Sequence, residues 1–393
     1  MDGDINETST EIQRSVESIK PVVKEAKRHS DSLVVAAAEI IIQDPVPLIT
    51  EKDTVPNSKD GKEFDKRNFV SLSPYWYRNE EGQLELRDGE INPETMNYHD
   101  SENLAIVENS IYLTALAARE VEGEDEKEKF AQYAMTNIKY WFVNESTRMT
   151  PSFEFAQMKQ GEETGNFYGI IEGTGLVYVV QGIDILREEG LIDDETYEGV
   201  KTWFKEYLNW LQTSEKAVGN PNAENEKEKG GEKEMPNNHG TFYDVQVAYI
   251  ADFLGDRDLV IKTLGSAKSR IESQITLEGE MPEESKRGGG SAMAYEIFNL
   301  EAFAKLAILG KKYDVDLWKE DKLQKAFRYF ADKLKNAGDN PFVFDRKGAM
   351  YLSFRAASQA YYNQEYWDLP TRYYSDPLIE EMTEKMFRKP EAV

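Results

Sequence analysis

The chain has 393 residues, of which 40% are hydrophobic and 31% charged, and its formal net charge is -26. This composition provides enough apolar side chains for a core and excludes a wholly disordered chain. The negative charge argues against nucleic acid or an anionic membrane as a partner, because either would need a basic face. A polyanionic ligand would be repelled at long range and would need local positive charge in its binding site.

The chain has no cysteine, which excludes disulfides, thiolate nucleophiles and zinc–thiolate sites. Its three histidines lie far apart without a paired ligand motif, so we expect no metal site and no cofactor. The longest apolar run, Leu33 to Ile42, is too short to span a bilayer. The acidic start, residues 1–11, lacks the basic region of a signal peptide. A secreted protein whose signal peptide has been removed would look the same.

Apolar residues recur at helical spacing along most of the chain, strand-like alternation is scarce, and Gly and Pro lie between the periodic segments. The pattern predicts an all-α protein of successive helical hairpins, either a bundle, a solenoid or an α/α toroid. Such folds reach this length as one domain, and we expect a single domain over residues 1–393. Helices are expected over Leu104–Arg119, Lys129–Val143, Leu176–Glu188, Tyr197–Gln212 and Phe298–Leu309.

Three stretches interrupt the helical pattern. Residues 70–93 are expected to form a loop, residues 147–175 also break the helical pattern, and both carry unusual aromatic and polar residues. Residues 217–238 are rich in Lys, Glu, Gly and Asn. We expect 217–236 to be a mobile surface loop, which serves either as a lid or as a plain solvated connector.

The three histidines have different surroundings. His29 lies among charged residues of an amphipathic segment and is expected at the surface. His99 precedes a helix start that Asp100 or Ser101 is expected to cap, which favours a structural role.

His239 belongs to the run Asn237-Asn238-His239-Gly240, directly before an apolar helix that opens at Thr241. A helix N-terminus has free backbone N–H groups and a positive dipole end, and both suit a carboxylate ligand. A capped helix with a buried histidine would give the same pattern, so the run alone does not decide its role.

A second polar cluster contains Arg287, the three glycines that follow it, and Tyr295 at the entry to a helix over 296–309. Arginine has a planar guanidinium for a carboxylate, and a phenol gives or takes a proton. Glycines let the backbone approach a ligand closely. Each residue type is common in loops and helices, so these observations become specific only in combination.

The combination resembles the alginate lyase family of polysaccharide lyases over about residues 30 to 330. The resemblance rests on the order of four motifs, which are Pro74-Tyr75-Trp76, Arg148-Met149-Thr150-Pro151 with Gln157, the run from Asn237 to Gln246, and Tyr295-Glu296-Ile297-Phe298-Asn299-Leu300. It implies an incomplete α/α toroid whose helix ends line a long cleft, an anionic polysaccharide substrate, and a secreted or periplasmic location. The glycines after Arg287 leave its register against the family's arginine open.

The resemblance also implies a site for β-elimination in a uronic-acid polymer. Asn238, Arg287 and His239 would neutralise the substrate carboxylate, while Tyr295 and His239 would exchange protons. Further substrate-binding candidates are Gln157, Tyr75, Trp76, Tyr243 and Asn237, with core packing as the alternative for Trp76.

Stereochemistry divides the possible substrates. In β-mannuronate and β-glucuronate the C5 proton and O4 lie on one side, so Tyr295 can act as base and then as acid. In α-guluronate they lie on opposite sides, which would make His239 the base and Tyr295 the acid. We expect a mannuronate-rich alginate, with glucuronan as the alternative polymer.

Two other function classes stay open at the level of sequence. A glycoside hydrolase on the same fold would need a pair of carboxylates, for which Glu172, Asp244 and Glu283 are nominal candidates. A protein that binds the polysaccharide without cleaving it would keep the same cleft.

Overall fold

The computed structural model describes residues 32–52, 54–56, 63–223, 229–288, 290–338, 341–342 and 345–391. Among these residues the chain divides into two compact units, an N-terminal unit over 32–232 and a C-terminal unit over 233–391, which are treated separately below. The single domain over 1–393 stays a prediction. His29, expected at the surface, lies outside the described residues.

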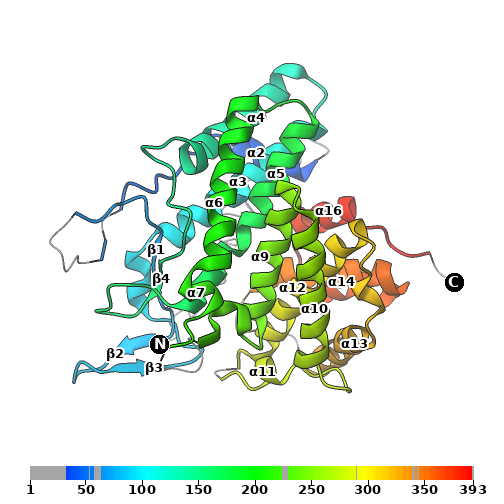
Figure 1. Cartoon of the computed structure of the whole chain (residues 1–393). Coiled ribbons are helices and arrows are strands. Elements are labelled where there is room, and N and C mark those ends of the chain that lie inside the picture. The colour runs from blue at the N-terminus through cyan, green and yellow to red at the C-terminus, as the bar shows by residue number, and fades with distance from the viewer. Residues whose placement is uncertain are drawn as a thin grey trace, which may run out of the picture. The chain divides into compact units, whose positions relative to one another are not determined.

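The N-terminal unit is built around one long helix, α3, which packs against α2, α4 and α5. Its helices are α2 (Leu33–Ile41), η1 (Pro93–Asn97), α3 (Asp100–Glu120), α4 (Glu124–Ile138), the π-helical η2 (Lys139–Val143), η3 (Phe167–Gly175), α5 (Leu176–Glu188), α6 (Asp194–Thr213) and α7 (Glu215–Val218). Figure 1 labels the α-helices among these elements.

Four short strands accompany these helices. Strand β1 (Val70–Leu72) pairs in parallel with β4 (Phe155–Met158), and β2 (Trp76–Arg78) pairs antiparallel with β3 (Leu84–Leu86). The prediction that 70–93 is a loop was therefore wrong in part, because Trp76 lies in a strand opposite Leu86. A hairpin this short has too few alternating residues to be recognised from periodicity.

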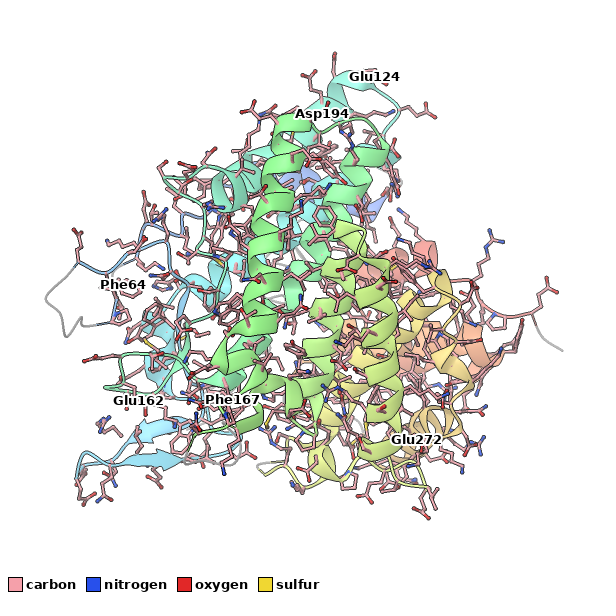
Figure 2. The ribbon with its side chains drawn as sticks, in the orientation of Figure 1. Phe64, Glu124, Glu162, Phe167, Asp194 and Glu272 are labelled. Carbon is pink, nitrogen blue, oxygen red and sulfur yellow. The ribbon has the colours of Figure 1, made fainter. Side chains whose placement is uncertain are left out.

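The predicted helices of this unit are confirmed, and several begin earlier than their apolar pattern. Helix α6 starts at Asp194 because the Asp193 side chain caps it, accepting from the Thr196 backbone N–H at 2.7 Å. Figure 2 marks Glu124 and Asp194 in the first turns of α4 and α6. Acidic side chains there complement the positive end of each helix dipole.

The cap predicted at the start of α3 was wrong. Exposed His99 occupies the N-cap position and makes no side-chain capping bond. Asp100 is buried instead, where it forms an ion pair with Lys52 and accepts from the Val70 backbone N–H at 2.8 Å. Asp100 therefore pairs with a residue far away in the sequence instead of capping α3, as the local pattern had predicted.

The core of this unit contains buried tryptophans whose polar atoms are all bonded. Trp203 stacks on Tyr207 at 5.5 Å between ring centroids and donates to the Met149 carbonyl at 2.6 Å. The stretch Phe167–Glu188 is apolar and long enough to cross a membrane, but 67% of its apolar window is buried inside the protein. That burial is typical of a core helix.

The C-terminal unit is also helical, and α9 and α10 run side by side in it (Figure 1). Gly255 ends α9 with φ +79°, a conformation that favours glycine, and Asp256 caps α10 by accepting from the Leu259 N–H at 3.1 Å. The helices are α9 (Asn238–Leu254), α10 (Arg257–Gln274), α11 (Pro282–Ser285), α12 (Ala292–Lys312), η5 (Leu317–Lys319), α13 (Asp321–Lys335), α14 (Lys347–Tyr361), α15 (Gln364–Tyr373) and α16 (Pro377–Met386).

The stretch predicted as a mobile loop, 217–236, is described except for 224–228. Its two ends meet, because a Cβ on Gly219 would overlap the Lys229 carbonyl and one on Gly231 would overlap backbone of Lys216 and Ala217. A short 3-10 turn, η4 (Glu232–Glu234), precedes α9. The mobility of this stretch and its use as a lid stay predictions.

Candidate active site

The polar run around His239 forms the N-terminus of α9, as predicted, but the helix starts at Asn238, three residues earlier than the apolar pattern. Asn237 is the N-cap, and its side-chain oxygen accepts from the His239 N–H at 3.2 Å. Gly240 has no room for a side chain, since a Cβ would overlap the Met235 carbonyl. The glycine of the motif therefore lets the preceding segment cross the helix start closely.

Three backbone N–H groups at the start of α9 are not free, which corrects the sequence expectation. The Asn238 N–H donates to Glu284 Oε1 at 2.6 Å, and the His239 N–H is taken by the cap. The Thr241 N–H bonds to the Asn237 carbonyl at 3.2 Å. Any carboxylate bound here is therefore met mainly by side chains rather than by these amides.

Asn238 and Glu284 form the buried centre of this region. Asn238 is 0% exposed and Glu284, on α11, is 1% exposed. The Asn238 carboxamide nitrogen lies 3.0 Å from Oε1 and 2.9 Å from Oε2 of Glu284. Burial raises the pKa of Glu284 from its ordinary 4.5 to about 7, although the hydrogen bonds from Asn238 and the nearby Arg287 and His239 act in the opposite direction.

Arg287 and Tyr295 are brought together as predicted. The Arg287 guanidinium carbon lies 3.8 Å from the centroid of the Tyr295 ring, a stacked cation–π geometry. Tyr295 is in the first turn of α12 and is buried, while Arg287 and His239 are partly exposed. Asn238, His239 and Arg287 all lie near the Glu284 carboxyl, and Tyr295 lies against Arg287. We call these four residues the Asn–His–Arg–Tyr cluster.

A second guanidinium flanks Tyr295. Arg346 lies 5.8 Å from the Tyr295 ring centroid and 4.3 Å from that of Phe298. Its Nε donates to the Ala294 carbonyl at 3.1 Å, which fixes it next to the tyrosine. The two arginines give this corner of an acidic chain the local positive charge that an anionic ligand requires.

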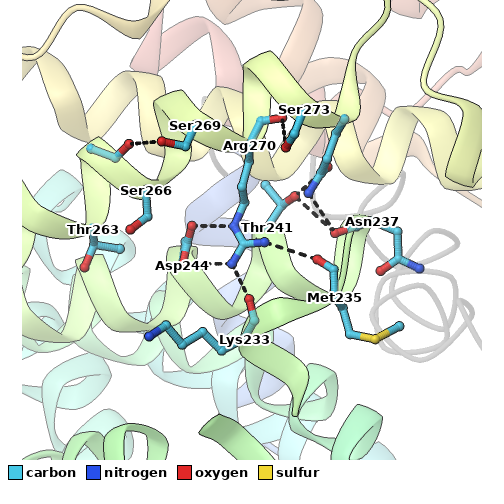
Figure 3. A network of polar contacts seen from close by, with 12 residues as sticks. Lys233, Met235, Asn237, Thr241, Asp244, Thr263, Ser266, Ser269, Arg270 and Ser273 are labelled. Atoms are coloured by element: carbon cyan, nitrogen blue, oxygen red, sulfur yellow. Dashed lines mark hydrogen bonds and ion pairs between the residues drawn. The ribbon is translucent and has the colours of Figure 1, made fainter. Parts of the chain in front are cut away.

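The segment before α9 is held by α10. Arg270 Nε donates to Asp244 Oδ2 at 2.6 Å, and its other nitrogens donate to the carbonyls of Met235, at 3.1 Å, and Lys233 (Figure 3). Both charged side chains are largely buried, at 13% and 3% exposure. One arginine therefore links α9 to the segment that precedes Asn237.

Hydrogen bonds among uncharged side chains join α9, α10 and α12 near the start of α9. Gln274 Oε1 accepts from Thr241 of α9 at 3.1 Å and from Asn299 of α12 at 3.0 Å, and its nitrogen donates to the Asn237 carbonyl at 3.4 Å. All three side chains are buried. This network sets the position of α12, and with it Tyr295, relative to Asn238.

Tyr243, a predicted substrate-binding residue, is 5% exposed. Burial raises the pKa of its phenol. Asn237, the other candidate on this helix, is occupied as the N-cap. Their contacts with a substrate stay predictions.

Three further candidates, Tyr75, Trp76 and Gln157, lie in the N-terminal unit and are partly exposed. The Lys159 ammonium lies 4.4 Å from the centroid of the Trp76 ring, a cation–π contact. This tryptophan therefore lies on the β2–β3 hairpin and is not part of the buried core. The Tyr75 carbonyl accepts from the Arg87 N–H at 2.9 Å, which fixes the start of the hairpin.

Gln157 has a left-handed backbone with φ +48°, which is uncommon for a non-glycine residue. Ser71 accepts from its N–H at 2.8 Å, and Asn166 donates to its carbonyl at 2.9 Å. Its side chain forms a hydrogen bond with Glu172. Burial raises the pKa of Glu172, although hydrogen bonds from Ser101, Gln157 and Ser71 act in the opposite direction. These contacts hold Gln157 in one position, and its binding of substrate stays a prediction.

Comparison with known proteins places this geometry in a family. The model of the family described as alginate lyase matches residues 54–341. The chain belongs to the alginate lyase family. It is therefore a polysaccharide lyase, and the family implies an anionic polysaccharide as substrate. No curated protein sequence matches it.

Two solved structures support the fold of this family member. It superposes on an alginate lyase from Bacteroides ovatus with a TM-score of 0.75 and 20% identity, covering 95% of this chain and 96% of that one. Against alginate lyase A1-III from Sphingomonas species A1 the TM-score is 0.54 at 12% identity, covering 88% and 92%. The predicted all-α, incomplete α/α-toroid fold is confirmed.

Two side chains of the region were not predicted. Glu284 stands beside Glu283 in the sequence, and nothing in the local pattern distinguishes the buried glutamate from the partly exposed one. Arg346 lies more than fifty residues from the motif it flanks, and its only local signal is its place just before α14. Both gain their positions from packing between distant segments.

Proposed function

We propose that this lyase cleaves a mannuronate-rich alginate by β-elimination at the Asn–His–Arg–Tyr cluster. The observation that supports this most is the convergence of an amide, an imidazole and a guanidinium around one buried carboxyl group, Glu284, with the ring of Tyr295 packed against that guanidinium. These groups correspond to the two requirements of the reaction, which are neutralisation of a carboxylate and transfer of a proton.

The C5 proton of a uronate is weakly acidic because the neighbouring carboxylate is negative. In the proposal Asn238, Arg287 and His239 donate hydrogen bonds to that carboxylate and stabilise the enediolate-like transition state. Preorganised donors of this kind are typically worth a factor of about 10²–10³ each in kcat. The dipole of α9, which begins at Asn238, adds to the positive potential.

Tyr295 is the proposed base and acid. In the proposal Tyr295, as a phenolate, accepts the C5 proton beside the Arg287 guanidinium, whose carbon lies 3.8 Å from the ring centroid. The resulting phenol then gives a proton to O4 of the leaving sugar. One residue suffices for both steps where C5–H and O4 lie on the same side, as in β-mannuronate and β-glucuronate.

The contacts of two of the three nominal hydrolase carboxylates favour a lyase over a glycoside hydrolase. Asp244 is bound by Arg270 at 2.6 Å, and Glu283 pairs with Lys286 at the surface. A hydrolase would need one carboxyl group as acid and a second as base or nucleophile, both facing the glycosidic bond.

The test is incubation of the purified protein with polymannuronate, polyguluronate, glucuronan and a neutral glucan, while the ultraviolet absorbance of an unsaturated uronate end is followed. We expect fastest growth on polymannuronate. Fastest growth on glucuronan would change the polymer but keep the mechanism, and reducing ends without absorbance would indicate hydrolysis and overturn the proposal.

Two tyrosine variants test the acid–base role. Tyr295→Phe should lower kcat by about 10²–10⁴-fold while polymer binding persists. Tyr249→Phe is the matched control, because it removes another buried hydroxyl of the same unit, one that donates to the Lys305 carbonyl at 3.0 Å. Equal activity of both variants would remove Tyr295 from the mechanism.

His239→Gln separates the two roles of the histidine. Glutamine keeps a hydrogen-bond donor but cannot act as a base at neutral pH. On polymannuronate we expect kcat of His239→Gln to stay at least about tenfold higher than kcat of Tyr295→Phe. A loss as large as that of Tyr295→Phe would make His239 a proton-transfer group instead.

We also propose a secreted or periplasmic location, because a long anionic polymer does not cross a membrane unaided. Fractionation of cells that produce the natural protein tests this. Recovery in the cytoplasmic fraction alone would contradict it.

A further inference from the structure

Glu284 is a buried carboxyl group that the elimination reaction itself does not use. It is 1% exposed, and its two oxygens receive three hydrogen bonds from Asn238 alone, one from the backbone at 2.6 Å and two from the carboxamide at 3.0 and 2.9 Å. Capping the start of α9 does not by itself require a buried glutamate, because other acceptors would satisfy the helix terminus equally well. The contact therefore points to a role of Glu284 toward the Asn238 carboxamide.

The carboxamide of Asn238 is bonded at one end only. Its nitrogen faces Glu284, whereas its oxygen is buried and has no hydrogen-bond partner among the described residues. In this orientation the end not held by Glu284 is an acceptor. An acceptor would repel a uronate carboxylate, so recognition requires the opposite orientation, which exchanges the two ends by a half-turn of the amide plane.

We propose that Glu284 is a positioning residue that decides which end of the Asn238 carboxamide is offered to the substrate, and that its neutral form sets the productive orientation. The inference rests on the proposed function. When neutral, Glu284 has one O–H donor, which bonds the Asn238 oxygen, while Oε1 still accepts from the Asn238 backbone N–H. The freed amide nitrogen then donates to the uronate carboxylate. When ionised, Glu284 is an acceptor only and draws the nitrogen back.

The surroundings of Glu284 place this change near neutral pH. Burial favours the neutral acid, whereas His239 and Arg287 favour the ionised form, and the result is a pKa of about 7. Ser285, next in the chain, donates to Glu296 at 2.8 Å, and Glu296 is itself held by Lys333. The titratable and charged groups on the packed elements are His239 of α9, Glu283 of α11, the following Lys286 and Arg287, Tyr295 and Glu296 of α12, and Lys333 of α13.

The first experiment is the pH dependence of KM and kcat on polymannuronate at constant ionic strength. If only the neutral acid binds substrate productively, KM of the wild type should rise about tenfold between about pH 6 and pH 8 for a pKa of about 7, with little change in kcat. Glu284→Gln donates from its amide at every pH, so its KM should stay near the low-pH value of the wild type.

Glu283→Gln is the matched control. It removes a carboxylate from the same short helix, but from a partly exposed ion pair with Lys286. We expect it to keep the wild-type pH profile. If Glu284→Gln keeps that profile as well, the inference is overturned while the lyase proposal stands.

A second measurement depends neither on activity nor on the Glu284→Gln variant. In protein labelled with ¹⁵N-asparagine, the carboxamide resonance that Asn238→Ala removes should shift with an apparent pKa near 7. A resonance that does not change between about pH 6 and pH 8 overturns the inference. Absence of wild-type activity on every uronate polymer would refute the proposed function instead, and the resonance would still decide whether Glu284 controls the amide.

Discussion

Arg270 binds Asp244 through Nε at 2.6 Å, and the same guanidinium donates to two backbone carbonyls just before α9, those of Met235 and Lys233. Asp244 is 3% exposed, so its charge has little access to water. The pair therefore fixes both the helix and the chain that enters it. Any change in this arginine should affect the position of Asn238 and His239.

Arg270→Met keeps the apolar stem but leaves the Asp244 charge buried and uncompensated. We expect the free energy of unfolding to fall by about 3–5 kcal/mol at neutral pH. Chemical denaturation measures this. Lys268→Met is the control on the same helix, since Lys268 is 60% exposed and its pair with Glu320 should contribute little to stability. Similar losses for both variants would contradict a special role of the buried pair.

Arg287→Lys should impair catalysis although it conserves the charge. Lysine has no planar guanidinium to stack on Tyr295 or to bind a carboxylate through two parallel hydrogen bonds. We expect kcat/KM on the preferred polymer to fall by about 10²–10³-fold. Lys286→Met removes the neighbouring, 63% exposed cation and should have little effect. A fully active Arg287→Lys variant would reduce the arginine to a general source of positive potential.

The stability of the protein should depend on pH through Glu284. Its pKa is raised from 4.5 to about 7 on folding, so the folded state binds the proton more tightly than the unfolded state. This contribution is fully present below about pH 4.5 and is lost as the pH rises through 7. The unfolding free energy of Glu284→Gln relative to wild type should therefore increase by about 3 kcal/mol between pH 4.5 and 8. A constant difference across this range would show that Glu284 titrates normally.

Salt should help the enzyme at low ionic strength. The chain carries a formal charge of -26, and a uronate polymer is also negative, so their long-range repulsion is screened as salt approaches about 0.15 M. We expect KM for the polymer to fall over this range. If KM rises with salt instead, the local field of Arg287 and Arg346 outweighs the net charge during binding.

The sequence by itself determined most of the helices and the polar run that precedes α9. Helical periodicity involves residues within a few positions of one another, so α5, most of α6 and the approximate start of α9 could be predicted from the chain, whereas the Asn237 cap was not predicted. The order of the Asn-Asn-His-Gly and Tyr295 motifs was enough to predict the family.

Tertiary structure alone decided the environment of each side chain. Glu283 and Glu284 are neighbours with the same chemistry, yet one pairs with Lys286 at the surface and the other is 1% exposed against Asn238. Trp76 became a strand residue because of a partner ten residues away, and the N–H groups at the start of α9 were taken by Glu284 and the cap. Burial, and the pKa and hydrogen bonding that follow from it, depend on packing between segments far apart in the chain, which no local pattern of residues contains.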